Sequence, residues 1–268
     1  MIIHDGHVHS HFCPHGSADK MEEYIERAIK LGLSSISFTE HAPLPRGFKD
    51  PVPGQDSAIT LDVLPQYLKT AEELKNYYSS KINVSTGLEV DFIDGYEKEI
   101  TSFLNEWGGK LDDTILSVHF LRLPDNSYIC LDYSPEAFQL LIETCGSLKK
   151  CYELYYKTLL QSVKADLGPF TPARIGHITL IRKFQKLFPR NFDDSLFLEE
   201  IMTALNKYSK ELDVNTAGLE KVHCKETYPP QRWIERAVSL DIPLVYGSDA
   251  HSAGRTGGGR SSVEKYFN

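Results

Sequence analysis

Short apolar runs alternate with longer amphipathic segments along the chain. The short runs are rich in β-branched and aromatic residues and end at polar or glycine positions, which is typical of buried parallel strands. They predict strands at residues 2–5, 35–39, 82–87, 114–118, 174–176, 212–215 and 243–246. A further run at residues 128–131 follows a turn-like segment, so we expect it to pair with the fourth strand as a small hairpin.

Helical periodicity fills the segments between the predicted strands. Apolar residues recur three and four positions apart over residues 21–32, which is the spacing of one helix face. Similar patterns predict helices at residues 61–78, 95–107, 135–146, 148–165, 193–208 and 230–240. Strands that alternate with helices in this way predict an α/β fold with a parallel sheet.

No break in composition separates the predicted strand–helix units. We therefore expect a single domain over residues 1–268, built as a closed or nearly closed α/β barrel. An open, doubly wound sheet would give the same pattern and is the alternative. The proline-rich segment 43–57 is expected to be an ordered loop near a site. The glycine-rich segment 254–259 is expected to be a flexible or substrate-covering loop.

Composition narrows the class of protein. The 268 residues are 41% hydrophobic and 25% charged, as in globular proteins. A net charge of −8 disfavours a general nucleic-acid binder. No apolar run approaches the roughly 18 residues of a membrane span, and no signal-peptide pattern opens the chain. Five cysteines without a CxxC motif predict no disulfide framework and fit a reducing cytoplasm.

Six of the seven predicted strands end in residue types that bind metals, whereas the sixth, at Asn215, offers no obvious ligand. The residues at these strand ends are His7 with His9, His41, Glu89, His119, His177, and Asp249 with His251. Because the carboxyl ends of parallel strands face one side of the fold, we expect these side chains to meet at one mouth.

Two of these strand ends carry residues two positions apart. His7 and His9, and likewise Asp249 and His251, should project from one face of an extended strand, because side chains alternate along it. With His15 added, the candidates exceed the roughly four ligands of one zinc ion, so more than one cation is predicted. Clustered cations suit phosphate monoester hydrolysis, since they generate hydroxide and clamp phosphoryl oxygens.

Longer strings around these residues resemble a known family. The strings HVH at 7–9, TEH at 39–41, GLE at 87–89, SVH at 117–119, GH at 176–177 and SDAH at 248–251 resemble the polymerase-and-histidinol-phosphatase (PHP) superfamily. Within it, FCPHG at 12–16, TEHAPLP at 39–45, LSVHF at 116–120 and RIGH at 174–177 are similar to the L-histidinol-phosphate phosphatases. The resemblance implies a distorted (β/α)7 barrel with three divalent metal ions (Zn, Fe or Mn).

The resemblance also implies the ligand sets and the reaction. It assigns His7, His9, Glu89 and Asp249 to the first metal, Glu89, His119 and His177 to the second, and His15, His41 and His251 to the third. The implied substrate is small and phosphorylated: L-histidinol phosphate is hydrolysed to L-histidinol and phosphate in histidine biosynthesis. Our hypothesis has a metal-bridging hydroxide as nucleophile, with Asp249, His251 or a metal-bound water as the catalytic acid.

Arginine suits phosphate because its guanidinium donates two parallel hydrogen bonds. Arg174, Arg182 and Arg255 are therefore candidate substrate ligands, and Arg174 is also a candidate catalytic residue. Strand alternation places Arg174 on the face opposite His177 unless the backbone bulges, and an ion pair is its alternative role. Asn215 is expected either to contact the substrate or to cap a helix.

Three neighbours of the candidate ligands have more ordinary expected roles. Asp5 and Glu40 are expected to accept a hydrogen bond from a ligating imidazole, or else to lie at the surface. Cys13 is expected to be a small buried thiol.

Three other functions fit parts of the pattern. The same metal centre could act on a nucleotide, a phosphotyrosine or a DNA end. A metallo-amidohydrolase also begins with HxH, but it would call for a carbamylated lysine and an eighth strand. A non-catalytic, metal-bound module would normally lack some ligands. The sequence specifies neither the metal nor an oligomeric state.

Overall fold

The computed structural model describes residues 3–267, so Ile2 of the first predicted strand lies outside the described residues. The strands are β1 (His4–Val8), β2 (Ser35–His41), β3 (Asn83–Asp91), β4 (Asp113–Ser117), β5 (Phe120–Arg122), β6 (Tyr128–Cys130), β7 (Arg174–Ile175), β8 (Glu211–Asn215) and β9 (Leu244–Gly247). The strands β2 and β3 are buried along almost their whole length, as expected where parallel strands are covered on both faces.

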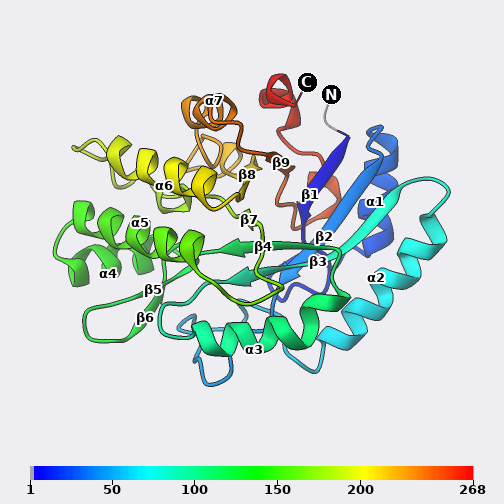
Figure 1. Ribbon diagram of the computed structural model, residues 1–268, viewed down its shortest axis with the longest axis horizontal. Coiled ribbons are helices and arrows are strands. Elements are labelled where there is room, and N and C mark those ends of the chain that lie inside the picture. Colours follow the sequence, from blue (N-terminus) through cyan, green and yellow to red (C-terminus); the bar gives the residue numbers. More distant parts are fainter. Residues whose placement is uncertain (1–2, 268) are drawn as a thin grey trace.

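Seven of these strands form one parallel sheet, in the order β1-β2-β3-β4-β7-β8-β9. Its two edges meet, because Val8 bridges in parallel to Ala250, just beyond β9. The backbone N–H of His9 donates to the carbonyl of Ala250 at 2.9 Å, and that of Asp249 donates to the carbonyl of His7 at 2.8 Å. The sheet is thus a nearly closed, distorted (β/α)7 barrel (Figure 1), and the doubly wound alternative is wrong.

Within residues 3–267, seven α-helices lie outside the barrel strands (Figure 1). They are α1 (Met21–Lys30), α2 (Leu64–Tyr78), α3 (Glu97–Trp107), α4 (Pro135–Cys145), α5 (Leu148–Lys164), α6 (Ser195–Lys207) and α7 (Gln231–Ser239). Short 3₁₀ turns occur at Gly108–Lys110, Leu180–Arg182, Ala217–Leu219, Ala253–Arg255, Arg260–Ser262 and Glu264–Tyr266. Each α-helix buries one apolar face, which is the role its periodicity predicts.

Local sequence explains why α4 and α5 are two helices. Gly146 ends α4 in a left-handed conformation (φ 81°), which costs glycine little because it has no Cβ. Ser147 then caps α5, and its hydroxyl accepts a hydrogen bond from the N–H of Lys150 at 3.3 Å.

Two local expectations were wrong. Strand β6 pairs antiparallel with β5 and not with β4, so this hairpin stands outside the barrel sheet. The segment 254–259 is fastened to the barrel: the Gly257 N–H donates to Asp5, and the Gly258 carbonyl accepts from Thr216 and Tyr246 at 2.6 Å each. Glycines allow backbone conformations that other residues rarely adopt. In this segment, hydrogen bonds to distant residues hold the backbone in one such conformation.

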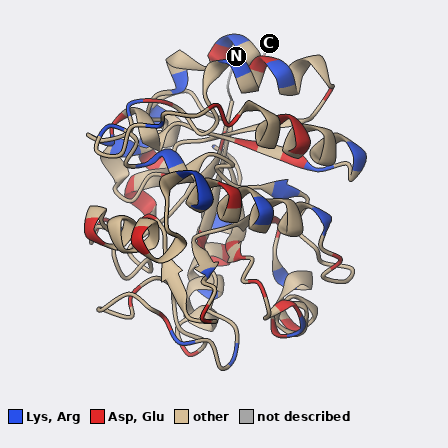
Figure 2. Cartoon of the chain, turned by 90° about the vertical axis from the view of Figure 1, so that its left-hand side faces the viewer, with Lys and Arg blue, Asp and Glu red and all other residues tan. Residues whose placement is uncertain are grey.

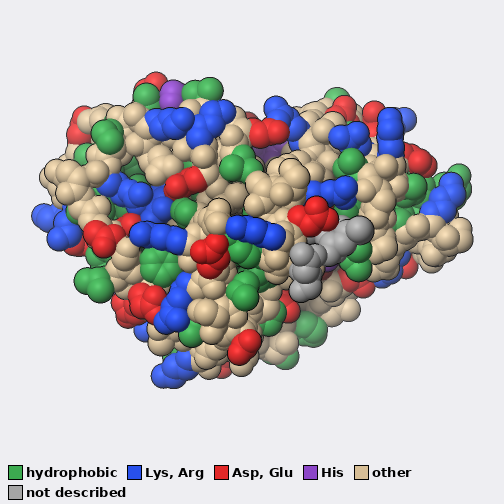
Figure 3. All heavy atoms as spheres, turned by 90° about the horizontal axis from the view of Figure 1, so that it is seen from above, with side chains coloured by type: hydrophobic (Ala, Val, Ile, Leu, Met, Phe, Trp, Pro, Cys, Tyr) green, Lys and Arg blue, Asp and Glu red, His purple; other side chains and the backbone are tan. Residues whose placement is uncertain are grey.

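Charge is spread over the described surface. Basic and acidic residues both occur on the helices in Figure 2, and both kinds are interspersed with hydrophobic side chains on the face drawn in Figure 3. Among residues 3–267, no helix combines the length and apolarity that crossing a bilayer requires.

Candidate metal centre

A cavity of about 380 Å³ opens at the carboxyl ends of the barrel strands. One part of its wall consists of histidines and carboxylates, among them His41, Glu89 and His119. The other part has no such concentration and consists of Val52, Asp56, Ser57, Phe120, Cys130, Asp132, Tyr133, Leu180, Lys183, Ala217, Lys221 and Tyr228. The segment 43–57 contributes Val52 and Asp56, as expected of an ordered loop near the site.

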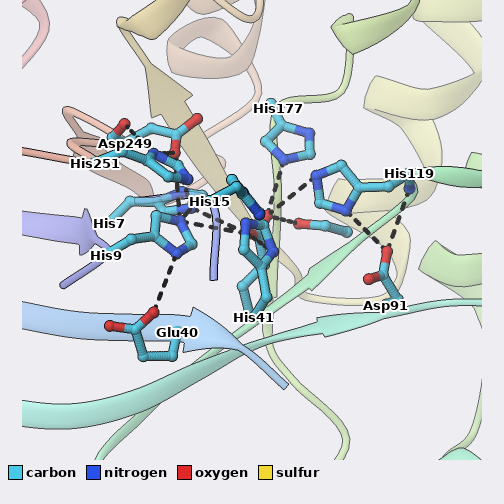
Figure 4. Close-up of polar contacts among 12 residues, drawn as sticks. His7, His9, His15, Glu40, His41, Asp91, His119, His177, Asp249 and His251 are labelled. Atoms are coloured by element: carbon cyan, nitrogen blue, oxygen red, sulfur yellow. Dashed lines mark hydrogen bonds and ion pairs between the residues drawn. The ribbon is translucent and has the colours of Figure 1, made fainter. Parts of the chain in front are cut away.

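Two imidazoles converge at the carboxyl end of β1. The Nε2 atoms of His7 and His9 lie 3.2 Å apart, and both side chains are fully buried. Glu89 Oε2 lies 3.4 Å from His7 Nε2 and 3.6 Å from His9 Nε2, and Asp249 Oδ1 lies 3.3 Å from His9 Nε2. The side chains of His7, His9 and Asp249 point toward one another in Figure 4, as the HxH and DxH spacings predict.

Glu89 stands between two groups of imidazoles. Its Oε2 lies 3.1 Å from His41 Nδ1, whereas its Oε1 lies 2.8 Å from His177 Nε2 and 3.8 Å from His119 Nε2. The hydroxyl of Ser117 also donates to Oε1 at 2.5 Å. One carboxylate with two differently directed oxygens can bridge two cations.

His15, His41 and His251 form the third group. The ring of His15 lies 5.0 Å from that of His41 and 5.2 Å from that of His251, between centroids. The Nδ1 of His15 is 2.9 Å from the carbonyl of Asp56, which leaves Nε2 free to face the cavity. The fold therefore brings all nine predicted metal ligands to one mouth, from strands far apart in sequence.

Two carboxylates that the sequence analysis missed orient the imidazoles. Asp213 Oδ2 lies 3.0 Å from His7 Nδ1, and Asp91 Oδ1 lies 2.8 Å from His119 Nδ1. Each carboxylate fixes one ring nitrogen as a donor, so the other nitrogen keeps a lone pair for the cavity. Strand alternation could have found both, because Asp91 is two positions from Glu89 and Asp213 is two positions from Asn215.

The two carboxylates expected to orient imidazoles behave differently. Glu40 Oε2 is 3.8 Å from His9 Nδ1, while its Oε1 accepts from Ser10 N–H at 2.6 Å. The expectation for Asp5 was wrong. Its buried carboxylate accepts from the N–H groups of Ser248 and Gly257, both at 2.9 Å, and so holds the backbone after β9.

Glycine and backbone strain also shape the mouth. A Cβ on Gly247 would overlap the side chains of His7 and Asp213, so only glycine admits this pair. Asp249 adopts a left-handed backbone conformation (φ 52°), which is rare for residues other than glycine and is concentrated at functional sites.

The structure gives Arg174 a different role from the predicted one. It lies at the amino end of β7, inside the barrel, where its Nη2 donates to Asp113 Oδ1 at 2.8 Å. It lines a separate pocket with His4 and Asp113, at the opposite end of the strands from His177. Strand alternation and the absence of a bulge explain this position, and the prediction of a catalytic or phosphate-binding Arg174 is withdrawn.

The other two predicted arginines are also engaged elsewhere. Arg182 is buried and donates to both oxygens of Asp194, each at 2.8 Å. Arg255 is exposed and forms an ion pair with Glu220. Neither guanidinium lines the described cavity wall, because each has a carboxylate partner that the local sequence does not reveal.

Asn215 and Lys183 both lie at the site, but the sequence analysis named only Asn215. Asn215 caps the turn at Ala217 through its Oδ1, and its Nδ2 donates to Asp249 Oδ2 at 3.1 Å. Lys183 lines the cavity and donates to Asp132, at 2.8 Å to Oδ2 and 2.7 Å to the carbonyl. The sequence carries no signal for Lys183, since the turn Leu180–Arg182 sets its direction.

The electrostatics of the described side chains show that the mouth demands positive charge. Burial opposes the charged form of His119, but Asp91 and Glu89 outweigh it and raise its pKa to about 10. Burial likewise opposes protonation of His9, but the nearby carboxylates of Asp249 and Glu40 raise its pKa to about 9. Burial and the neighbouring His9 lower the pKa of His251 to about 3. In the absence of metal ions, protons on some imidazoles thus supply the positive charge that bound cations would supply.

The donor set fits divalent cations on structural grounds. His9 Nδ1, His41 Nδ1 and His177 Nδ1 are buried without a hydrogen-bond partner. Nitrogen and oxygen atoms gather within 4.8 Å of one another in two groups, one of His7, His9 and Glu89 and one of His41, Glu89 and His119. Mixed imidazole and carboxylate donors suit Zn²⁺, Fe²⁺ or Mn²⁺.

Family comparison agrees with this geometry. The model of the PHP domain matches residues 5–220, and the chain belongs to the PHP domain family.

The chain is also similar to individual proteins of known name or structure. The chain is 47% identical over 255 residues to the histidinol-phosphatase of Bacillus subtilis (strain 168), covering 94% of this chain and 95% of that protein. A solved structure from Listeria monocytogenes matches with a TM-score of 0.92 and 37% identity, covering 97% of this chain and 99% of that one. A Lactococcus lactis histidinol phosphate phosphatase, solved with zinc, L-histidinol and phosphate, shares the fold with a TM-score of 0.70 and 21% identity, over 98% and 93% of the two chains.

Proposed function

We propose that this protein hydrolyses L-histidinol phosphate to L-histidinol and phosphate, as a metal-dependent phosphomonoesterase of histidine biosynthesis. The observation that carries the proposal is the convergence of imidazoles and two carboxylates at the barrel mouth. The likeness to the Bacillus subtilis histidinol-phosphatase supports the choice of substrate. Seven strands and a glutamate at the bridging position disfavour an amidohydrolase.

Three divalent cations (Zn, Fe or Mn), when bound, would supply the hydroxide and the positive charge that phosphoryl transfer to water requires. We assign the ligands as His7, His9, Glu89 and Asp249 for one cation, Glu89, His119 and His177 for a second, and His15, His41 and His251 for a third. In this assignment Glu89 would contribute to two sites, because its two oxygens face different imidazoles.

The surrounding residues prepare this site before substrate arrives. Asp213 holds the proton on Nδ1 of His7, and Asp91 does the same for His119, so both Nε2 lone pairs face inward. Asn215 steadies Asp249 from the other side. Such fixed orientation lowers the cost of reorganisation during the reaction.

The leaving alkoxide needs a proton, and two side chains are placed to provide it. The side chains of Asp249 and His251 are 19% and 30% exposed, whereas His7 and Glu89 are enclosed. We propose that Asp249 or His251 accepts the proton released by the attacking water and passes it to the leaving oxygen at the open side of the cavity. This assignment needs no movement of the enclosed ligands.

Lys183 and Asp132 provide the charged contacts that the predicted arginines do not. Two N–H donors of the Lys183 ammonium are engaged by Asp132, which leaves a third for a phosphoryl oxygen. The negative Asp132 carboxylate suits the substrate's amino group. A cavity of about 380 Å³ suits a ligand of this size.

Steady-state kinetics test the proposal. The purified protein, reconstituted in turn with Zn²⁺ and Mn²⁺, would be assayed on L-histidinol phosphate, a nucleoside monophosphate, phosphotyrosine and a DNA 3′-phosphate. We expect kcat/KM for L-histidinol phosphate to exceed the others by about 100-fold, since several polar contacts each discriminate by about tenfold or more. Equal activity on all four substrates would contradict the specific assignment and favour a general phosphoesterase.

A further inference from the structure

Cys13 lies beside the third group of histidines, in the turn that follows β1. Its side chain is only 3% exposed. Its sulfur and one ring nitrogen each from His9, His41 and His251 form a set of four atoms that all lie within 4.8 Å of one another. Among the groups of this kind within residues 3–267, this one has the most members, and it alone contains sulfur.

The backbone fixes the direction of this sulfur. The N–H of Cys13 donates to the Ser10 carbonyl at 3.0 Å, and the N–H of Gly16 donates to the Cys13 carbonyl at 3.0 Å, which closes a tight turn. The next residue, Ser17, donates from its N–H to the carbonyl of His251 at 2.8 Å. The turn is therefore attached to the strand end that carries His251, so Cys13 and His251 approach the same point from the two ends of the chain.

A second observation marks this point as a ligand site. The Nδ1 atoms of His9 and His41 are buried without hydrogen-bond partners, on side chains that are 0% and 7% exposed. Buried ring nitrogens without hydrogen-bond partners, next to a buried sulfur, are a donor set that a divalent cation can bind.

We propose that Cys13 is a protein ligand of the third cation, which is then held by one thiolate together with His15, His41 and His251. On binding, the S–H bond breaks, its proton passes to solvent, and a sulfur lone pair forms the bond to the cation without any change of oxidation state. The proposal rests on the proposed function only in assuming a cation at this position. Because sulfur is a soft donor, it makes this position selective for Zn²⁺ over Mn²⁺.

Cobalt substitution tests the proposal without turnover. The metal-free protein would be titrated with Co²⁺ while near-ultraviolet absorption is recorded, where sulfur-to-cobalt charge transfer is seen. We compare the wild type with Cys13→Ser and with Cys151→Ser, a control that removes another buried thiol, in α5. We expect the band in the wild type and the control and its loss in Cys13→Ser. Zinc affinity of one site should fall at least tenfold, since even outer-shell substitutions cost about 10–100-fold.

X-ray absorption of the zinc-loaded wild type provides the second measurement. A sulfur scatterer at about 2.3 Å is expected, and this result does not depend on whether any variant folds. Full cation loading without a sulfur scatterer, or a charge-transfer band that survives Cys13→Ser, would overturn the proposal. A sulfur signal in a protein that does not hydrolyse L-histidinol phosphate would support the Cys13 ligand while contradicting the proposed function.

Discussion

The two ends of the barrel bury charge in opposite ways. At the amino end, Arg174 is 1% exposed and its guanidinium donates to Asp113 at 2.8 Å, so a cationic side chain neutralises a carboxylate. At the carboxyl end, Glu89 and Asp249 face imidazoles whose nitrogens also face one another, as His7 and His9 do at 3.2 Å. Within residues 3–267, the ion-pair partners of Glu89 and Asp249 are all histidines, whereas Asp113 pairs with an arginine.

This difference identifies the end that needs an external cation. Burying a charge without a partner costs several kcal/mol, so an ion pair inside the chain marks structure. Imidazole nitrogens and carboxylate oxygens that face one another, without enough protons to link them by hydrogen bonds, indicate a metal site. A substitution at one end can therefore be compared with a substitution at the other.

The largest effect is expected from Glu89→Gln. An amide cannot bridge two cations with two negative oxygens, so metal content should fall and kcat/KM should drop by about 10³-fold or more. Metal analysis and kinetics on L-histidinol phosphate measure both effects. The control is Glu211→Gln at the amino-end pocket, which should retain both metal and activity. A fully loaded and active Glu89→Gln enzyme would show that the carboxylate is not a bridge.

An intermediate effect is expected from Asp213→Asn. The amide preserves the shape of the contact at 3.0 Å but no longer holds the His7 imidazole with a negative charge. We expect about a 10–100-fold loss in metal affinity or kcat/KM, measured by competition with a chelator and by kinetics. Asp113→Asn, a carboxylate change at the amino end, should leave both quantities unchanged. Equal losses in the two variants would mean that the effect is general destabilisation.

The smallest effect on catalysis is expected from Arg174→Met. Since this guanidinium contacts Asp113 and not the cavity, kcat should stay within about twofold of the wild type. The free energy of unfolding in urea should fall by about 2–3 kcal/mol, because one partner of a largely buried ion pair is lost. The double variant Arg174→Met with Asp113→Leu should recover part of that loss. A large fall in kcat with unchanged stability would return Arg174 to the list of catalytic candidates.

Most of the fold and the cluster could be predicted because both depend on short-range periodicity. The carboxyl ends of the strands in a parallel barrel face one side. The positions of His41, Glu89 and His177 at or just after the ends of their predicted strands were therefore sufficient to place them together. Alternation also held the information for Asp91 and Asp213, although the sequence analysis did not use it there.

The arginines and the hairpin could not be predicted in this way. Arg182 is held by Asp194 across a turn, and Arg255 by Glu220, and neither pairing follows from residue spacing. The pairing of β6 with β5 instead of β4 depends on how the loop after His119 leaves the barrel. Such choices depend on which side chains pack nearby and on solvent exclusion, which a local pattern does not encode.

The sequence by itself determined the alternation of strands and helices, the residue types at the strand ends and the need for positive charge there, because these follow from periodicity and from donor chemistry. Closure of the sheet into a barrel was decided by tertiary contacts such as the bridge between Val8 and Ala250. Only the tertiary structure decided which charges neutralise one another, that Lys183 and not an arginine faces the cavity, and that Cys13 meets His251. The physical reason is range: alternation acts over two residues, whereas electrostatic pairing and coordination depend on distances of a few ångströms between segments far apart in the chain.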